Sequence, residues 1–393
     1  MKKYLIIAAA AALTLASCAK IENYTENNNE LVPIAFSNYS PKALAKAGDT
    51  YVNSTSLVSG KQFAVYAWQT AYNNFLGVNP GTPAFMNPAV VTYAGNTTDG
   101  STNTYTPVRF WPSGDEPSNL SFTAYYPYGA AGITAPTFAT GVGSYAFTAQ
   151  STPAAMVDFC VADVVNDQTY AHTNKTAAGY NGTVNLPFKH MLTKVQFKFK
   201  KAQNLGETTV IELVDAELSG INNTGTLNAT YAQNASPAVN ALGTTSYAWA
   251  SVSGAAGYEV TLNTGDPESG REIVLTESAS TVADADIFLM VPQTIAADTQ
   301  KLTVTWNVKY YDTVAHANAN GAEGLLDTVP NSAVLSFYSD LKASDTDDTA
   351  AAAIQWGRNN FITYTITIGP KPIWFTATVD NWDSEQNGFF NAQ

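Results

Sequence analysis

A strictly alternating stretch near the middle of the chain limits its possible folds more than any other feature. Over residues 192–200 apolar side chains alternate with polar ones, and three of the polar ones are lysines. Successive side chains of a β-strand point to opposite faces of the sheet, so the pattern predicts a strand with one face in a core and one in water. Further strands are expected at residues 62–68, 302–310 and 361–368. We therefore predict an all-β protein.

The first residues have the layout of a secretory signal. Lys2 and Lys3 precede an apolar run over residues 5–15, and small residues lead into Cys18. The run is too short for a permanent membrane-spanning helix. The ending Leu-Ala-Ser-Cys looks like a bacterial lipobox, which predicts removal of residues 1–17 and attachment of diacylglycerol and a further acyl chain such as palmitate to Cys18. The alternative is an ordinary signal peptide with an incidental cysteine.

Removal of the signal leaves an acidic chain that is poor in charged residues. It keeps 17 of the 19 basic side chains against 32 acidic ones, a formal charge of −15. This charge disfavours nucleic acid and anionic membrane as partners. Charged residues make up 13% of the sequence and aromatic residues 12%, which is typical of an exported β protein.

The length and the polarity profile predict two domains behind a tether. Residues 18–30 are polar and read as a flexible tether. We expect an N-terminal domain over residues 31–189 and a C-terminal domain over residues 190–393. The sequence shows no repeat of fixed period, so we do not expect a solenoid or a propeller.

The first strand of the N-terminal domain and the last strand of the C-terminal domain have similar alternating patterns. Val32, Ile34 and Phe36 share one face of the first strand, and Pro33 indicates that this strand lies at an edge. Ile373, Phe375, Ala377 and Val379 form a matching apolar face in the last strand. Between them we expect a hairpin of residues 108–112 and 120–127 and a short helix at residues 345–353.

Motifs for catalysis are absent from the sequence. The three histidines lack metal-ligand spacing, and we interpret His190 as a structural residue and Cys160 as a small buried hydrophobe. The acidic stretch 345–348 could bind calcium but more closely matches a solvated turn. Exposed aromatic residues could form a sugar platform, although most aromatics of a β-sandwich lie in its core. We therefore predict no enzyme, cofactor or metal.

Several segments, in order along almost the whole mature chain, resemble the fimbrillin family of Bacteroidetes lipoproteins, the subunits of type V pili. The matching segments are the lipobox at Cys18 and residues 34–36, 110–112, 122–127, 186–195, 288–293, 364–368 and 375–382. The resemblance implies two transthyretin-like β-sandwich domains in tandem. It also implies an outer-membrane lipoprotein precursor that later becomes part of a fimbrium on the cell surface, supporting adhesion.

The same resemblance implies assembly by donor-strand exchange. A trypsin-like protease would cut the loop after the first strand, at Lys46 or Lys42, since this loop has no arginine. The displaced strand with Val32, Ile34 and Phe36 would be replaced by a neighbour's strand, with Ile373, Phe375, Ala377 and Val379 as its apolar positions. Partners would be further copies, accessory fimbrial subunits and a possible host glycan or protein.

One alternative function and a possible modification remain open from the sequence. The chain could be a surface-anchored glycan-binding or adhesin lipoprotein, including a pilus tip or anchor subunit, that does not polymerise as a stalk. Asp-Thr-aliphatic sequences at residues 312–314, 327–329 and 348–350 are similar to the O-glycosylation signal of these bacteria.

Overall fold

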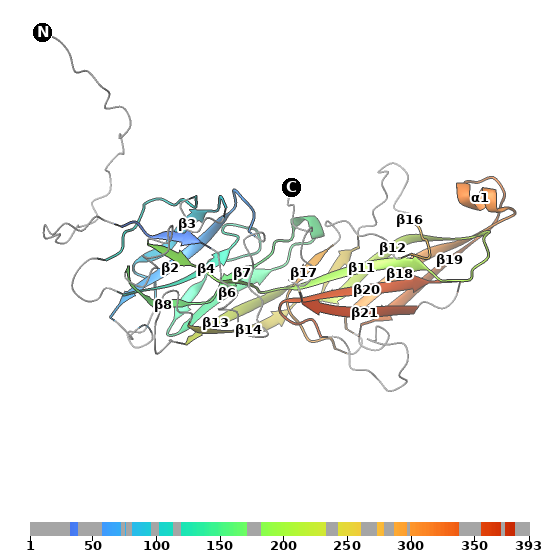
Figure 1. The fold of residues 1–393 in the computed structure, drawn as a ribbon. Coiled ribbons are helices and arrows are strands. Elements are labelled where there is room, and N and C mark those ends of the chain that lie inside the picture. Colours follow the sequence, from blue (N-terminus) through green and yellow to red (C-terminus); the bar gives the residue numbers. More distant parts are fainter. Residues whose placement is uncertain are drawn as a thin grey trace, which may run out of the picture. The chain divides into compact units, whose positions relative to one another are not determined.

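The computed structural model is built almost entirely of strands (Figure 1), which confirms the all-β prediction. It describes residues 32–37, 57–71, 75, 81–95, 102–112, 119–170, 182–232, 243–260, 273–278, 287–296, 299–337, 355–370 and 374–381. In this part of the chain helical structure is limited to α1 (Val314–Ala319) and the short 3-10 helix η2 (Pro153–Ala155). None of these residues forms a helix long and apolar enough to cross a membrane.

A six-stranded sheet, here called the central sheet, is buried on both faces. Its strands follow the order β10-β7-β4-β2-β3, and β8 also pairs with β4. On β2, Phe63 and Val65 enter one apolar core whereas Ala64 and Tyr66 enter another. The sheet is therefore the middle layer of three. Its strands are β2 (Gln62–Thr70), β3 (Met86–Thr92), β4 (Asn119–Tyr126), β7 (Cys160–Ala162), β8 (Val165–Gln168) and β10 (Phe188–His190).

A second sheet, the cover sheet, packs on one face of the central sheet. Tyr145 and Leu227 from the cover sheet share a core with Tyr66 and Tyr125 from the central sheet. The strand order is β14-β13-β6-β5. These strands are β5 (Thr137–Ala139), β6 (Val142–Thr148), β13 (Thr224–Ala232) and β14 (Thr244–Ser253).

The strands of the cover sheet do not follow the expected boundary between residues 189 and 190. β13 and β14 lie in the second half of the chain, yet β13 pairs antiparallel with β6 from Thr224↔Thr148 to Thr230↔Val142. Strands within residues 224–253 therefore share a sheet with strands from the first half of the chain. Contacts join Val32–Gln393 into one unit, and the division into two domains stays a prediction.

The opposite face of the central sheet is covered by a small two-stranded sheet. β1 (Ala35–Ser37) runs parallel to β9 (Thr183–Asn185), with Phe36 opposite Val184. Both of these side chains belong to the core that also holds Phe63 and Phe122 of the central sheet. The predicted first strand thus forms, and it lies on top of the central sheet rather than within it.

The remaining strands form a sandwich of two sheets. The order is β17-β11-β20-β21 in one and β15-β12-β18-β19 in the other, where β16 also pairs with β12. Val195 and Ile362 from the first sheet belong to the same core as Leu218 and Val304 from the second. The strands are β11 (Thr193–Lys201), β12 (Thr209–Ile221), β15 (Ala256–Glu259), β16 (Ile273–Val274), β17 (Phe288–Met290), β18 (Lys301–Tyr311), β19 (Leu325–Ser336), β20 (Asn360–Ile368) and β21 (Trp374–Asn381).

Two local expectations were wrong. Residues 108–112 do not form a hairpin with 120–127, because Phe110 bridges to Pro33 while β4 pairs with β2, β7 and β8. The polar face of β11 is not all in water, since Lys194 is buried with its ammonium 4.2 Å from the ring centre of Phe361. The helix expected at residues 345–353 falls outside the described residues.

Candidate functional site

Backbone hydrogen bonds hold the first strand on both sides. The Ile34 amide donates to the Arg109 carbonyl at 2.9 Å, and the Ala35 amide donates to the Gly182 carbonyl at 3.2 Å. At the other end the Leu186 amide donates to the Ser37 carbonyl at 2.7 Å. Neighbouring backbone therefore contacts the strand on both sides, although Pro33 had indicated an edge position.

Two side chains also recognise carbonyl groups of this strand. The Tyr105 hydroxyl donates to the Ile34 carbonyl at 2.9 Å, and the Asn103 amide nitrogen donates to the Phe36 carbonyl at 3.0 Å. Burial raises the pKa of Tyr105 above its ordinary value of 10.0, so the phenol remains a donor. These two hydrogen bonds go to the backbone and do not depend on the strand's own side chains.

The apolar side of the first strand fills a cradle of aromatic rings. Phe36 is fully buried, with its ring centre 5.5 Å from that of Tyr105 and 5.9 Å from that of Phe122. Ile34 is also buried, and Val32 is half-buried against the same core. Burying each of the two inner side chains is worth about 1.5–3 kcal/mol as an upper estimate. A chain that lost this strand would therefore leave apolar surface exposed on the central sheet.

A glycine permits the close approach of β1 to the chain beside β9. Gly182 has φ +79°, and a Cβ at this position would lie 2.8 Å from the Pro33 carbonyl oxygen. Its own carbonyl accepts from the Trp111 indole at 3.0 Å as well as from Ala35. A side chain here would collide with the first strand, so the site depends on glycine.

The last strand lies at the edge of its sheet. β21 pairs antiparallel with β20 over eight positions, from Asn360↔Asn381 to Thr367↔Trp374. In the strand order it has no neighbour on its other side within the described residues. Val379 is 45% exposed although it pairs with the buried Ile362. The strand could therefore separate without breaking any other pairing of that sheet.

The other predicted site residues are only partly covered by the structure. Phe375 and Ala377 lie in β21 opposite Ile366 and Tyr364, and their side chains are outside the described part of the structure. Also outside it are Cys18, Lys42, Lys46 and Ile373. The roles of these residues stay predictions.

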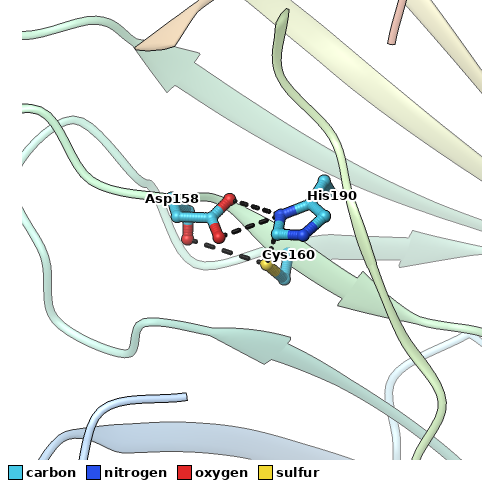
Figure 2. A group of neighbouring side chains, drawn as sticks. All are labelled: Asp158, Cys160 and His190. Atoms are coloured by element: carbon cyan, nitrogen blue, oxygen red, sulfur yellow. Dashed lines mark hydrogen bonds and ion pairs between the residues drawn. The ribbon is translucent and has the colours of Figure 1, made fainter. Parts of the chain in front are cut away.

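One cluster of potential metal ligands was missed in the sequence. Asp158, Cys160 and His190 converge beside the end of the central sheet (Figure 2), with their ligand atoms within 4.8 Å of one another. Cys160 is fully buried, as its apolar neighbours had indicated. His190 lies opposite Cys160 in the pairing of β10 with β7, a contact that a separation of 30 residues does not reveal.

Comparisons with known proteins agree with this fold. The model of the family described as fimbrillin-like matches residues 50–382. The chain is 27% identical over 221 residues to the fimbrium subunit Fim1C of Phocaeicola vulgatus, a match that spans about half of each protein, 53% of this chain and 54% of that relative. A crystal structure of a fimbrial protein from Bacteroides vulgatus superposes with a TM-score of 0.58 at 19% identity, covering 89% of this chain and 99% of the other. The chain therefore belongs to the fimbrillin-like family, and the relatives named above are fimbrial proteins and not enzymes.

Proposed function

We propose that the chain is a structural subunit of a cell-surface fimbria, exported as a lipoprotein precursor and polymerised by exchange of its first strand. The observation that supports the proposal is the way β1 is bound. The strand forms a separate layer, held by backbone hydrogen bonds over an apolar core. Among the described strands only β9 pairs with β1, so its release would leave every strand pairing of the central sheet intact. A fimbrium-subunit relative and the family assignment support this function.

Release of the first strand requires a cut after it. β1 ends at Ser37 and the next described residue is Leu57, so Lys42 and Lys46 fall in the connecting stretch. Leu57 is buried in the same core as Phe36. A cut at either lysine would free the first strand and leave Leu57 with the rest of the subunit.

β21 has the properties required of the replacing strand. It is an edge strand, and its predicted apolar positions repeat every second residue, as do Val32, Ile34 and Phe36. Within the subunit it pairs with β20, so donation to a neighbour requires those eight pairs to open. Backbone pairing of the donated β21 in the neighbour's vacated β1 site would restore hydrogen bonds of the same kind.

The proposal is tested by removing both cleavage candidates. We expect the double variant Lys42→Ala/Lys46→Ala to remain monomeric when treated with a trypsin-like protease, while the wild type forms fibres. Lys61→Ala is the matched control, because Lys61 is an exposed lysine that follows the same connection and should not affect assembly. Normal fibres from the double variant would refute the cleavage step.

The tryptophans of the described part of the chain do not form an exposed platform for glycan binding. Trp68, Trp111, Trp306 and Trp356 are at most 4% exposed. Trp249 packs partly buried against the core between the central and cover sheets. The expectation that most aromatic residues of a β-sandwich lie in its core is thus met by these tryptophans.

A further inference from the structure

The cluster of Asp158, Cys160 and His190 has the geometry of a metal site. Both carboxylate oxygens of Asp158 lie 2.9 Å from His190 Nδ1, and Cys160 Sγ lies 3.7 Å from the same nitrogen (Figure 2). Cys160 Sγ is also 3.8 Å from the carbonyl oxygen of Asp158. Three different ligand types therefore surround one small volume.

This arrangement does not fit nucleophilic catalysis. In a Cys-His-Asp relay the cysteine contacts one ring nitrogen and the carboxylate orients the ring through the other. Here the thiol and the carboxylate both approach Nδ1. The imidazole cannot take a proton from the thiol at an atom already hydrogen-bonded to the carboxylate, so the cluster lacks the relay of a nucleophilic cysteine.

The observed separations are close to those of tetrahedral zinc. Bond lengths of about 2.3 Å to sulfur and 2.0–2.2 Å to nitrogen and oxygen place the ligand atoms about 3.6 Å (S to N) and 3.4 Å (N to O) apart. The sulfur–nitrogen distance of 3.7 Å already fits. The carboxylate, at 2.9 Å from the nitrogen, has to withdraw by about 0.5 Å.

Cys160 and His190 lie on paired strands of the central sheet, and Asp158 precedes the first of them. Cys160 and His190 are directly opposite in adjacent antiparallel strands, and Tyr126 of β4 pairs with Cys160 on its other side. Their side chains are buried, whereas that of Asp158 is 11% exposed. The carboxylate is thus the side of the cluster that reaches solvent.

We propose that Asp158, Cys160 and His190 bind one Zn²⁺ ion, with water completing the coordination. A thiolate and an imidazole select a borderline-soft cation such as zinc over calcium or magnesium. On binding, the thiol releases its proton to solvent as the sulfur–zinc bond forms, and the imidazole exchanges the Nδ1 proton of its hydrogen bond to Asp158 for one on Nε2, so that Nδ1 coordinates as neutral imidazole. The ion would tie β7 to β10 on the face of the central sheet that β1 covers, since Cys160 and Phe36 share one core.

Cobalt substitution tests the site directly. The full chain with Cys18→Ala, so that Cys160 is its single thiol, is stripped with a chelator and titrated with Co²⁺. We expect one equivalent to bind with a thiolate charge-transfer band in the near ultraviolet and tetrahedral d–d bands, and Zn²⁺ to displace it. Absence of the charge-transfer band in the folded chain would overturn the proposal.

Variants in the same Cys18→Ala background separate this site from other binding. Cys160→Ser should abolish the band, and Asp158→Asn should weaken Co²⁺ binding by at least about 10-fold. His316→Gln is the matched control, because it removes a second His–Asp pair, 2.6 Å apart, and should leave the spectrum unchanged. Zn²⁺ should raise the Tm of the parent chain and of the control but not of Cys160→Ser. Equal Co²⁺ uptake by Cys160→Ser would contradict the site.

Discussion

Phe36 is the residue of the first strand whose side chain we expect to contribute most to holding the strand in place. It is fully buried and contacts the rings of Tyr105 and Phe122. We expect Phe36→Ala to lower the free energy of unfolding by about 3–5 kcal/mol in urea denaturation. Leu326→Ala is the control, because Leu326 is 68% exposed and its truncation should cost no more than about 0.5 kcal/mol. Equal losses in the two variants would show that the first strand is not packed as described.

His316 provides a residue-scale test of electrostatics at α1. Its hydrogen bond to Asp312 raises the pKa of His316 above 6.5, and the same bond lowers the pKa of Asp312 below 3.8. The stabilisation from protonated His316 is complete below pH 6.5 and is lost as the pH rises through the folded-state pKa of His316. The stabilisation from ionised Asp312 is lost as the pH falls through the lowered pKa of Asp312. An NMR titration should show the pKa of His316 falling toward 6.5 in Asp312→Asn. An unchanged value would contradict the pairing.

α1 also changes the interpretation of one Asp-Thr sequence. Thr313 is the N-cap of the helix, and its hydroxyl accepts from the His316 amide at 3.3 Å. The Asp312-Thr313-Val314 sequence therefore has a structural role of its own. Asp327-Thr328-Val329 lies exposed on β19, where its side chains face solvent. Glycosylation at either sequence stays a prediction.

At the scale of elements, Gly182 tests the fit between β1 and the chain beside it. Gly182→Ala places a Cβ 2.8 Å from the Pro33 carbonyl and also strains a positive φ. Gly60→Ala is a matched control, since Gly60 has φ +84° with open space where a Cβ would lie and incurs only the backbone strain. We expect Gly182→Ala to lower Tm further and to speed amide hydrogen exchange in residues 34–37. Equal effects of the two variants would argue against close packing of β1.

The elements predicted from the sequence were those with large alternating apolar side chains. β2, β11 and β20 carry Phe, Val, Ile and Tyr at every second position, and burial of these side chains decides the strand. β13 and β14 were missed because threonine, asparagine, alanine and glycine dilute the pattern, although Leu227 and Tyr231 do alternate with polar residues. Their pairing with β6 is a contact between distant segments, which local pattern cannot supply.

The candidate site was predictable in part for the same reason. The alternation of Val32, Ile34 and Phe36 predicted the buried face of the first strand. Its polar partners Asn103 and Tyr105, and the glycine at position 182, depend on how the chain folds back over the central sheet. The cluster around His190 likewise depends on strand register.

At the scale of the whole molecule, the proposed donor strand β21 and the site of β1 that accepts a neighbour's strand can be removed separately. A chain truncated after residue 370 lacks β21 and should not polymerise after cleavage, yet it should still accept the last strand of an intact subunit. We expect native gels of a mixture of truncated and intact subunits, both cleaved, to show polymers that carry one truncated copy at one end and do not grow beyond it. Polymerisation of the truncated chain alone would mean that another segment is the donor.

The most direct test of assembly by strand exchange is mild trypsin treatment of the purified precursor, followed by intact mass measurement and electron microscopy. We predict a cut after Lys42 or Lys46, loss of the piece that carries Val32, Ile34 and Phe36, and growth of heat-resistant ladders and fibres. A clean cut that leaves a stable monomer with the first strand still bound would contradict assembly by strand exchange.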